Sequence, residues 1–210
     1  MLMRRLAVVI LTTTALLSVA IGMIRAAGMA GPPAMQGLLV RPDGAVCPSP
    51  CILGIRPRQT TYSQAISYIQ THPLTQNFVM QRVIDGAVFE GEGILLALTK
   101  GTGNELLFMN LIFQGTDGPF NAGALVGALG MPSSVRISEI SNVAELFYPD
   151  KNLYAMTRQR AVRTGRLSPA DHLDGITYFV AFPPLRMVGG TRWQGFTSTA
   201  RYQAAQRAAR

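Results

Sequence analysis

Residues 47–73 read CPSPCILGIRPRQTTYSQAISYIQTHP, and this stretch decides the predicted fold. Thr61 is followed three residues later by Gln64, the spacing of a capping box, which satisfies amides that the first turn of a helix leaves open. The final proline disfavours helical geometry in the residue before it, so we expect the helix to end at His72. Three apolar side chains share one face of this helix: Ala65, Ile66 and Ile69.

The same stretch holds the only two cysteines of the chain, Cys47 and Cys51. In an oxidising compartment a pair this close forms a local disulfide, and the two prolines between them stiffen the loop. A catalytic redox pair usually has two intervening residues, and a metal site needs further ligands. We therefore expect a structural disulfide, with no metal site and no cofactor.

The N-terminus carries a targeting signal. The stretch that begins with Leu6 and ends with Ile24 is uncharged, follows Arg4 and Arg5, and is close to the roughly 20 residues that cross a bilayer as a helix. Its length favours an uncleaved single-pass anchor in the cell membrane over a cleaved signal peptide, which would leave a secreted protein. In both cases we expect the body of the chain outside the cytoplasm, with residues 1–29 as anchor or signal segment and 30–46 as a Gly- and Pro-rich linker.

Strand-like segments follow the helix. Residues 78–84, 93–99 and 105–114 carry β-branched and aromatic residues at intervals, and the KGTGN sequence at 100–104 supplies the glycines that a hairpin needs. The pattern then returns, because 65–73 (AISYIQTHP) aligns with 124–132 (ALVGALGMP) without a gap. The strand-like segments of the second half are 134–140, 145–157 and 176–182, and the PDKN sequence at 149–152 is expected to form a hairpin turn within the second of them.

These segments predict an α+β fold, with an N-terminal transmembrane helix followed by a domain of two helix-plus-antiparallel-meander units. We place that domain at 47–196, with possible repeats at 47–115 and 116–182. Residues 197–210 are expected to form a basic C-terminal helix.

The net charge of +8 points to anionic partners, but the positive side chains are scattered. The nearest approach to a basic cluster is Arg158, Arg160, Arg163 and Arg166, a possible binding loop for an anionic polymer. It contains no interleaved aromatic, so we do not expect a nucleic-acid partner. Trp193, the only tryptophan, is a further possible binding residue, although packing is its more common role.

One group of residues near the C-terminal part of the chain has the composition of a catalytic site. His172 lies between Asp171 and Asp174, so a hydrolase with a histidine base and a carboxylate orienter can be drawn. Sequence neighbours seldom point at one another, and the preceding Ser168-Pro169 is typical of a surface turn. We therefore favour a binding role over a catalytic one and assign no catalytic residue, and a hydrolase that uses His172 with Asp171 or Asp174 stays the alternative.

The sequence GIRPRQTTYSQAISYIQTHP, and later AGALVGALGMP, each followed by a meander, resembles the unit of the small outer-membrane lipoproteins of the SmpA/OmlA type. Two such units in tandem resemble the β-lactamase inhibitory proteins. The order of anchor, CPSPCILGIRP and Thr-capped helix also resembles uncharacterised membrane-anchored bacterial proteins. The resemblance implies work through protein contacts. We therefore expect a membrane-anchored extracytoplasmic binding or scaffolding domain that contacts a protein or another envelope component.

Overall fold

A computed structural model describes residues 33–47, 51–56, 58–114, 120–138, 143–157, 165–179 and 190–208. The predicted membrane segment at 6–24 lies outside these ranges. Among the helices that the structure does describe, none has the length and apolar character needed to cross a bilayer.

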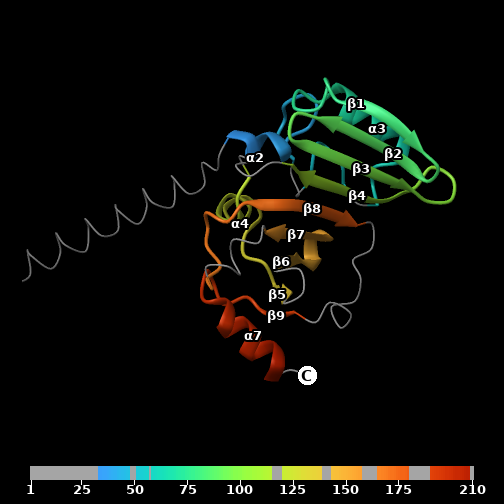
Figure 1. Cartoon of the computed structure of the whole chain (residues 1–210). Helices are drawn as coiled ribbons and strands as arrows, with labels where there is room; N and C mark the ends of the chain where they lie inside the picture. Colours follow the sequence, from blue (N-terminus) through green and yellow to red (C-terminus); the bar gives the residue numbers. More distant parts are fainter. Residues whose placement is uncertain are drawn as a thin grey trace, which may run out of the picture.

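The described strands form one antiparallel sheet of nine members, in the order β1-β2-β3-β4-β8-β7-β6-β5-β9. Figure 1 shows β1 to β4 at one end of this sheet and β9 at the other. The strands are β1 (Val79–Val83), β2 (Gly86–Gly91), β3 (Ile94–Lys100), β4 (Leu106–Phe113), β5 (Ser134–Ser138), β6 (Val143–Tyr148), β7 (Leu153–Thr157), β8 (Leu173–Phe179) and β9 (Thr191–Arg192).

Local turn chemistry sets the hairpins. Gly93 joins β2 to β3 with φ +71°, a left-handed conformation that side chains disfavour. Asn152 takes the same region at φ 51°, after a single 3-10 turn (η1, Pro149–Lys151), and leads β6 back into β7. Asparagine tolerates this region better than most residues, so the turn residues predicted here form the hairpin.

The middle of the sheet joins its two halves. β4 pairs with β8 over five residue pairs, from Phe108 opposite Phe179 to Ile112 opposite Gly175. Each half is a helix followed by four strands in sequence: α3 before β1 to β4, and α4 before β5 to β8. The last strand of each half, β4 or β8, therefore pairs with the last strand of the other, and the two halves form one continuous sheet.

One face of this sheet, the inner face, carries the core. Register places alternate residues of neighbouring strands on the same side, and the residues on this side are buried almost without exception. Helix α3 (Tyr62–Thr71) packs into this core through Ala65 and Ile69, both fully buried. The inner-face residues of the central strands include Phe89, Leu96, Leu98, Met109, Leu111, Ile176 and Tyr178.

The capping box predicted at the start of α3 is confirmed. The Gln64 amide N–H donates to the Thr61 hydroxyl at 3.3 Å, and the Gln64 side chain accepts from the Thr61 amide at 2.9 Å. Helix α4 (Ala122–Leu129) begins differently, because Asn121 Oδ1 accepts from the Ala124 amide at 2.8 Å. Both helices thus start on a side-chain acceptor.

The region expected to be a linker, 30–46, contributes to the fold. Pro33–Leu38 forms α2, and Met35 and Leu38 of this helix are buried in the core. The Leu53 amide donates to the Leu38 carbonyl at 2.7 Å, so the chain on both sides of the cysteine pair is held together. Cys47 and Cys51 are joined by a disulfide with a Cα–Cα distance of 6.0 Å.

The last described helix, α7 (Thr199–Ala208), is docked through Tyr202, which is fully buried. The Tyr202 hydroxyl donates to the Gly195 carbonyl at 2.8 Å and accepts from the Gln194 amide at 2.9 Å. Figure 1 places α7 beside β9 and β5, at the far end of the molecule from β1. The basic C-terminal segment is therefore attached along its first turns.

The predicted fold class is wrong. The described chain is mostly a nine-stranded antiparallel sheet with few helices, in place of an α+β domain of two separate units. The physical reason is the pairing of β4 with β8, which merges the strands of both halves into one sheet. The described helices do not support the predicted transmembrane helix, because none of them is long and apolar enough to cross a bilayer.

Candidate functional site

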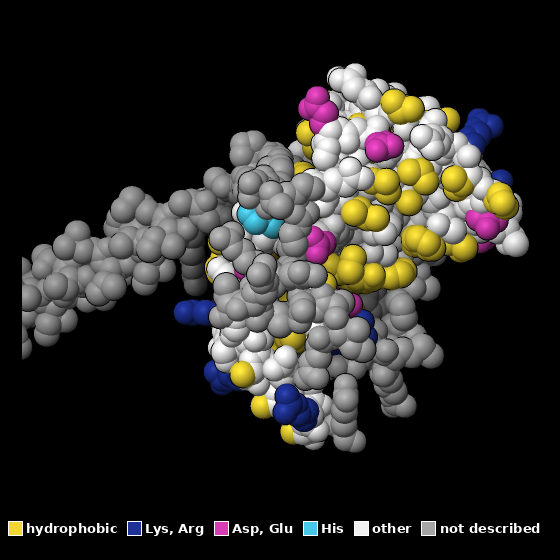
Figure 2. All heavy atoms as spheres, viewed as in Figure 1, with side chains coloured by type: hydrophobic (Ala, Val, Ile, Leu, Met, Phe, Trp, Pro, Cys, Tyr) yellow, Lys and Arg dark blue, Asp and Glu magenta, His cyan; other side chains and the backbone are white. Residues whose placement is uncertain are grey.

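The face of the sheet opposite the core forms an apolar surface over β1 to β4. Strand residues that alternate with the buried set point to this side. Figure 2 shows hydrophobic side chains gathered over the part of the molecule where Figure 1 draws these strands. We call this surface the open face, and its apolar residues are Val79, Val83, Val88, Leu95, Ala97, Phe108 and Ile112.

The open face is exposed to an unusual degree for residues of this kind. Val79 is 65% exposed, Val83 50%, Ile112 38% and Phe108 36%. Ile84, in the turn after β1, is fully exposed. Single exposed apolar residues are common, but here the exposed residues of β1 and β4 are joined across β2 and β3 by half-buried apolar ones, and a patch of this kind is typical of an interaction surface.

Aromatic side chains extend this surface across the centre of the sheet. Phe108 of β4 stands directly opposite Phe179 of β8. The Phe179 ring lies 5.6 Å from the Tyr154 ring, which in turn lies 5.8 Å from the Phe147 ring, measured between centroids. We call Phe108, Phe179, Tyr154 and Phe147 the aromatic row. Rings in this arrangement combine a large apolar area with few rotatable bonds, as binding surfaces favour.

A polar pair interrupts the apolar surface at the join of the halves. The Thr177 hydroxyl of β8 donates to Asn110 Oδ1 of β4 at 3.0 Å. These two residues are register partners, so the bond crosses directly between the two strands. It satisfies two polar groups of the open face, on which the register also places Gln81, Glu90 and Thr99.

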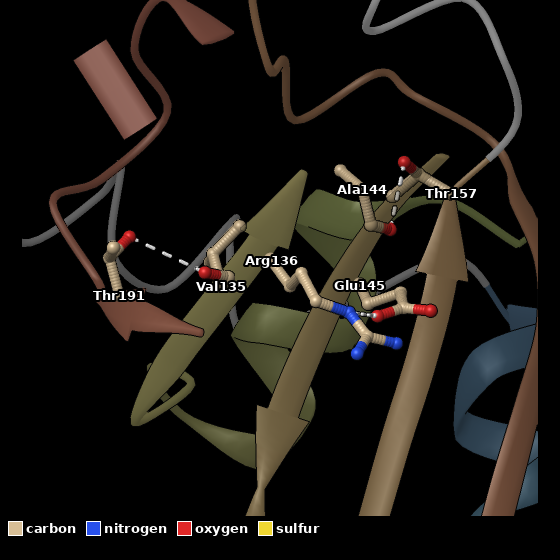
Figure 3. Close-up of polar contacts among 6 residues, drawn as sticks. All are labelled: Val135, Arg136, Ala144, Glu145, Thr157 and Thr191. Carbon is tan, nitrogen blue, oxygen red and sulfur yellow. Dashed lines mark hydrogen bonds and ion pairs between the residues drawn. The ribbon is translucent and has the colours of Figure 1, made fainter. Parts of the chain in front are cut away.

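The second half of the sheet carries charge on the same face. Figure 3 shows the Arg136 side chain of β5 reaching across to Glu145 of β6, with which it forms an ion pair. The hydrogen bond from Arg136 to Glu145 is the main cause that raises the pKa of the arginine. The Arg136 guanidinium also lies 5.8 Å from the centre of the Phe147 ring. Phe147 is buried, at 3% exposure. The aromatic row therefore runs from an open end at Phe108 to a covered end at Phe147.

Strand β1 adds a backbone edge to the open face. Among the described strands it pairs with β2 alone, so its other side presents backbone groups without a strand partner. Such an edge can accept a further strand from another chain. The opposite edge, β9, has two residues and lies next to α7, which makes it the less accessible of the two.

The residues singled out from the sequence lie elsewhere. Trp193 is partly buried, with its ring 5.2 Å from Phe196 and 6.4 Å from Tyr202, so it helps to hold α7. Arg166 is exposed and forms an isolated bridge with Ser198. The other three members of the proposed basic loop, Arg158, Arg160 and Arg163, lie outside the described residues.

The histidine constellation has structural partners. Asp171 is buried at 4% exposure, and its Oδ2 accepts from the Ser168 amide at 2.7 Å. The Asp171 carbonyl accepts from the Ala122 amide, and His172 forms an isolated bridge with Asn121. These contacts tie the start of β8 to the start of α4. Within the described ranges, no three side chains of His, Cys, Asp or Glu gather closely enough to hold a metal ion.

No protein-family model and no curated protein matches this chain. The chain is similar to the crystal structure of a DUF4309 family protein (YjgB) from Bacillus subtilis, with 10% sequence identity and a TM-score of 0.35. The match covers 65% of this chain and 87% of that one. A likeness this low carries no argument about function. These comparisons do not confirm the resemblance to the SmpA/OmlA lipoproteins or the β-lactamase inhibitory proteins.

Sequence reasoning missed the open face. The segments 94–99 and 106–113 are apolar at nearly every position, a pattern typical of strands buried on both sides. The clearest available signal is the isolated polar residue at Asn110, because a strand covered on both faces seldom places an amide at its centre.

Proposed function

We propose that this chain is a non-enzymatic binding domain that holds a protein partner on the open face of β1 to β4. The observation that carries the proposal is the exposure of Val79 and Val83 on β1 and of Phe108 and Ile112 on β4. The half-buried apolar residues of β2 and β3 on the same face, Val88, Leu95 and Ala97, lie between them. Removing such a patch from water contributes about 25 cal/mol for each Å² of apolar area buried, and the costs of association are subtracted from this gain. The partner is expected to present an apolar or aromatic surface of similar size.

The aromatic row gives the proposed interface a centre. Phe108 is the most open member of the row, and binding energy in protein interfaces concentrates on a few aromatic and aliphatic anchors. The Asn110–Thr177 hydrogen bond lies beside Phe108 and offers polar atoms for orientation. The polar pair would make binding specific, because a partner has to place matching polar groups opposite it within a mainly apolar contact.

We further propose that the domain acts outside the reducing cytoplasm. The Cys47–Cys51 disulfide supports this placement, because disulfides persist in oxidising compartments. Thiol labelling of the protein taken directly from its cell should detect free cysteine only after a reducing agent is added. Labelling without reduction would contradict the placement.

The binding proposal is tested with the double variant Val83→Ser/Ile112→Ser. Both side chains lie on the open face and are at least partly exposed, so the fold should remain intact. Partners are captured from the native source by the wild-type chain and identified, and their affinity for the variant is then measured. We expect the affinity to fall by about tenfold or more, since exposed apolar anchors are being removed.

The matched control is Val46→Ser/Met131→Ser. Val46 and Met131 are 78% and 75% exposed, and both lie outside β1 to β4. The control should bind as the wild type does. Equal affinity for wild type, test variant and control would refute the open face as the binding site.

A further inference from the structure

A polar groove lies away from the open face, between the turn at 41–43, the segment 54–60 and the exposed side of α3. Its volume is about 510 Å³, the size of a small-molecule site. Gly54 lies in the lining of the groove, and its φ of +81° is a conformation that favours glycine. A Cβ at this position would stand 2.9 Å from the Pro42 ring, so the close approach of the two segments also requires glycine. The groove is therefore a consequence of how the chain on both sides of the disulfide is folded.

Two arginines line the groove. The Arg56 amide donates to the Thr60 hydroxyl at 2.9 Å, and Arg56 Nη1 donates to Gln59 Oε1 at a longer 3.4 Å. Within the part of the chain that the structure describes, Arg56 Nη2 is buried and has no hydrogen-bond partner. A buried guanidinium nitrogen with no acceptor is costly in free energy, and a shift of the Arg56 side chain toward a ligand in the groove would give it an acceptor.

The second arginine, Arg41, comes from the turn at 41–43, whose backbone lies against Gly54. Neither it nor Arg56 forms an ion pair among the described residues. Asp43 is the carboxylate of the lining, and its Oδ1 accepts from the Ala45 amide at 3.0 Å within its own turn. The groove thus has an excess of positive charge, with two planar donors suited to an oxyanion.

The remaining wall is neutral and polar. Helix α3 contributes Gln64 and Ser67, and beside them the half-buried Tyr68 offers a ring surface. Amide and hydroxyl groups next to an aromatic ring are suited to a molecule rich in hydroxyl groups. The chemistry of the lining therefore combines an anion site with donors and acceptors for alcohols.

We propose that this groove binds a small polyhydroxylated anion, with its carboxylate or phosphate held by Arg41 and Arg56 and its hydroxyl groups against α3. The ligand class is independent of the protein partner on the open face, because no residue is shared between the two surfaces. Sugar acids and polyol phosphates both have this chemistry. The experiment distinguishes them.

Glucuronate, glycerol phosphate and neutral glucose are titrated into the full chain, with amide chemical shifts and calorimetry as readouts. We expect at least one of the two anions to bind at millimolar concentration or better, and to perturb α3 and the segment 54–60. Glucose should bind at least tenfold more weakly, since charge-assisted hydrogen bonds are the strong ones. The anion that binds more tightly identifies the carboxylate or the phosphate as the group recognised, and added salt should weaken it.

The variant Arg41→Gln should weaken anion binding by about tenfold or more. Arg201→Gln is the matched control, because Arg201 is an exposed arginine on α7 at the other end of the molecule. A second variant, Arg56→Lys, keeps the charge but loses the planar fork, and thermal unfolding of each variant shows whether the fold survives. The proposal is overturned if neither anion binds, if glucose binds equally well, or if Arg41→Gln and Arg56→Lys both fold and bind as the wild type does.

Discussion

The two halves of the sheet have the same order of elements and different outer surfaces. In each half a helix with a side-chain N-cap precedes four antiparallel strands, and the last strands, β4 and β8, meet in the centre. The first half leaves apolar side chains exposed on its outer face, beside the polar residues Gln81 and Glu90. On that face the second half carries the Arg136–Glu145 ion pair and the buried Phe147 ring. The two halves thus share the order of their elements and a common core, and they differ in the side chains of their outer face.

The two helices occupy equivalent places in the two halves but begin and end with different residues. The gapless alignment sets residue 61 against 120 and residue 72 against 131, an offset of 59. The N-cap of α4 is Asn121 and its C-cap is Gly130, so each lies one residue inside the aligned position. Helix α3 has 10 residues and α4 has 8. Whether the halves are a true duplication stays a prediction, but equivalent ends of the two helices are reached with different residues.

The largest expected effect is a loss of unfolding free energy when a residue on the buried face of the sheet is shortened, compared with a residue on the open face. Leu111 of β4 is fully buried and stands opposite Ile176 of β8, at the join of the halves. Leu111→Ala should lower the free energy of unfolding by roughly 2–5 kcal/mol, because it leaves a cavity in the shared core. Chemical denaturation measures the change.

Ile112→Ala is the control, since Ile112 is the next residue along and lies on the open face. It should change the free energy of unfolding by less than about 1 kcal/mol, as substitutions at exposed sites usually do. If Ile112→Ala destabilised the chain as much as Leu111→Ala, the open face would be part of the core, and the contrast drawn between the faces would fail.

The second prediction tests the join itself. Gly175 of β8 pairs with Ile112, and a Cβ at Gly175 would stand 2.5 Å from the Leu111 carbonyl oxygen. Gly175→Ala should therefore push β8 away from β4 and lower the free energy of unfolding by roughly 1–3 kcal/mol. Hydrogen exchange should speed up first at the amides of these two strands. An unchanged denaturation midpoint and unchanged exchange would show that the halves are not held together at this point.

The sequence predicts what local chemistry determines. The capping box of Thr61 and Gln64 and the hairpin turn that ends at Asn152 are found, because their partners lie within a few residues. The strand β2 is missed, since GAVFEG has glycine at both ends and only Ala87 and Phe89 show the buried alternation. Its neighbours β1 and β3 are found, and each of their ends lies one residue away from the prediction.

The features that sequence reasoning could not supply depend on distant pairing. Asn110 and Thr177 are 67 residues apart, and nothing near either residue specifies the other as its partner. The pairing of β4 with β8, of which these two residues are one of five pairs, is what makes the two halves share a sheet. The same limit hides the groove, because its lining combines the turn at 41–43, residues near Arg56 and one side of α3. The open face is hidden for another reason: β3 and β4 are apolar on both sides, so their pattern does not show which side is covered.

The third prediction compares the two helix starts. Thr61→Ala removes one half of the reciprocal capping box of α3, and Asn121→Ala removes the side-chain acceptor of α4. Each should lower the free energy of unfolding by about 1 kcal/mol, measured by denaturation. The Asn121 change is expected to be the larger, because Asn121 is half-buried and Thr61 is exposed to water. A larger loss at Thr61 would reverse this order and make the α3 start the more important of the two.

The smallest effect concerns the two helix ends, and it appears only with pH. Helix α3 ends at His72, which is 1% exposed and whose Nδ1 accepts from the Leu74 amide at 3.1 Å. Helix α4 ends instead at Gly130, with φ +83° and no titratable group. Burial lowers the pKa of His72 from its usual value, and the Val40 backbone opposes part of this change.

Protonation of His72 would charge a buried ring and remove the acceptor of the Leu74 amide. Because the folded pKa is below the unfolded value of about 6.5, the contribution of neutral His72 is complete above that pH and is lost as the pH falls through the folded pKa. Asparagine keeps an acceptor at this position without titrating, so His72→Asn should flatten this part of the dependence of unfolding free energy on pH. His172→Asn, which removes the other histidine, should leave it in place. If His72→Asn loses stability with falling pH as steeply as the wild type, the end of α3 is not a pH-dependent element, and the two helix ends differ in sequence alone.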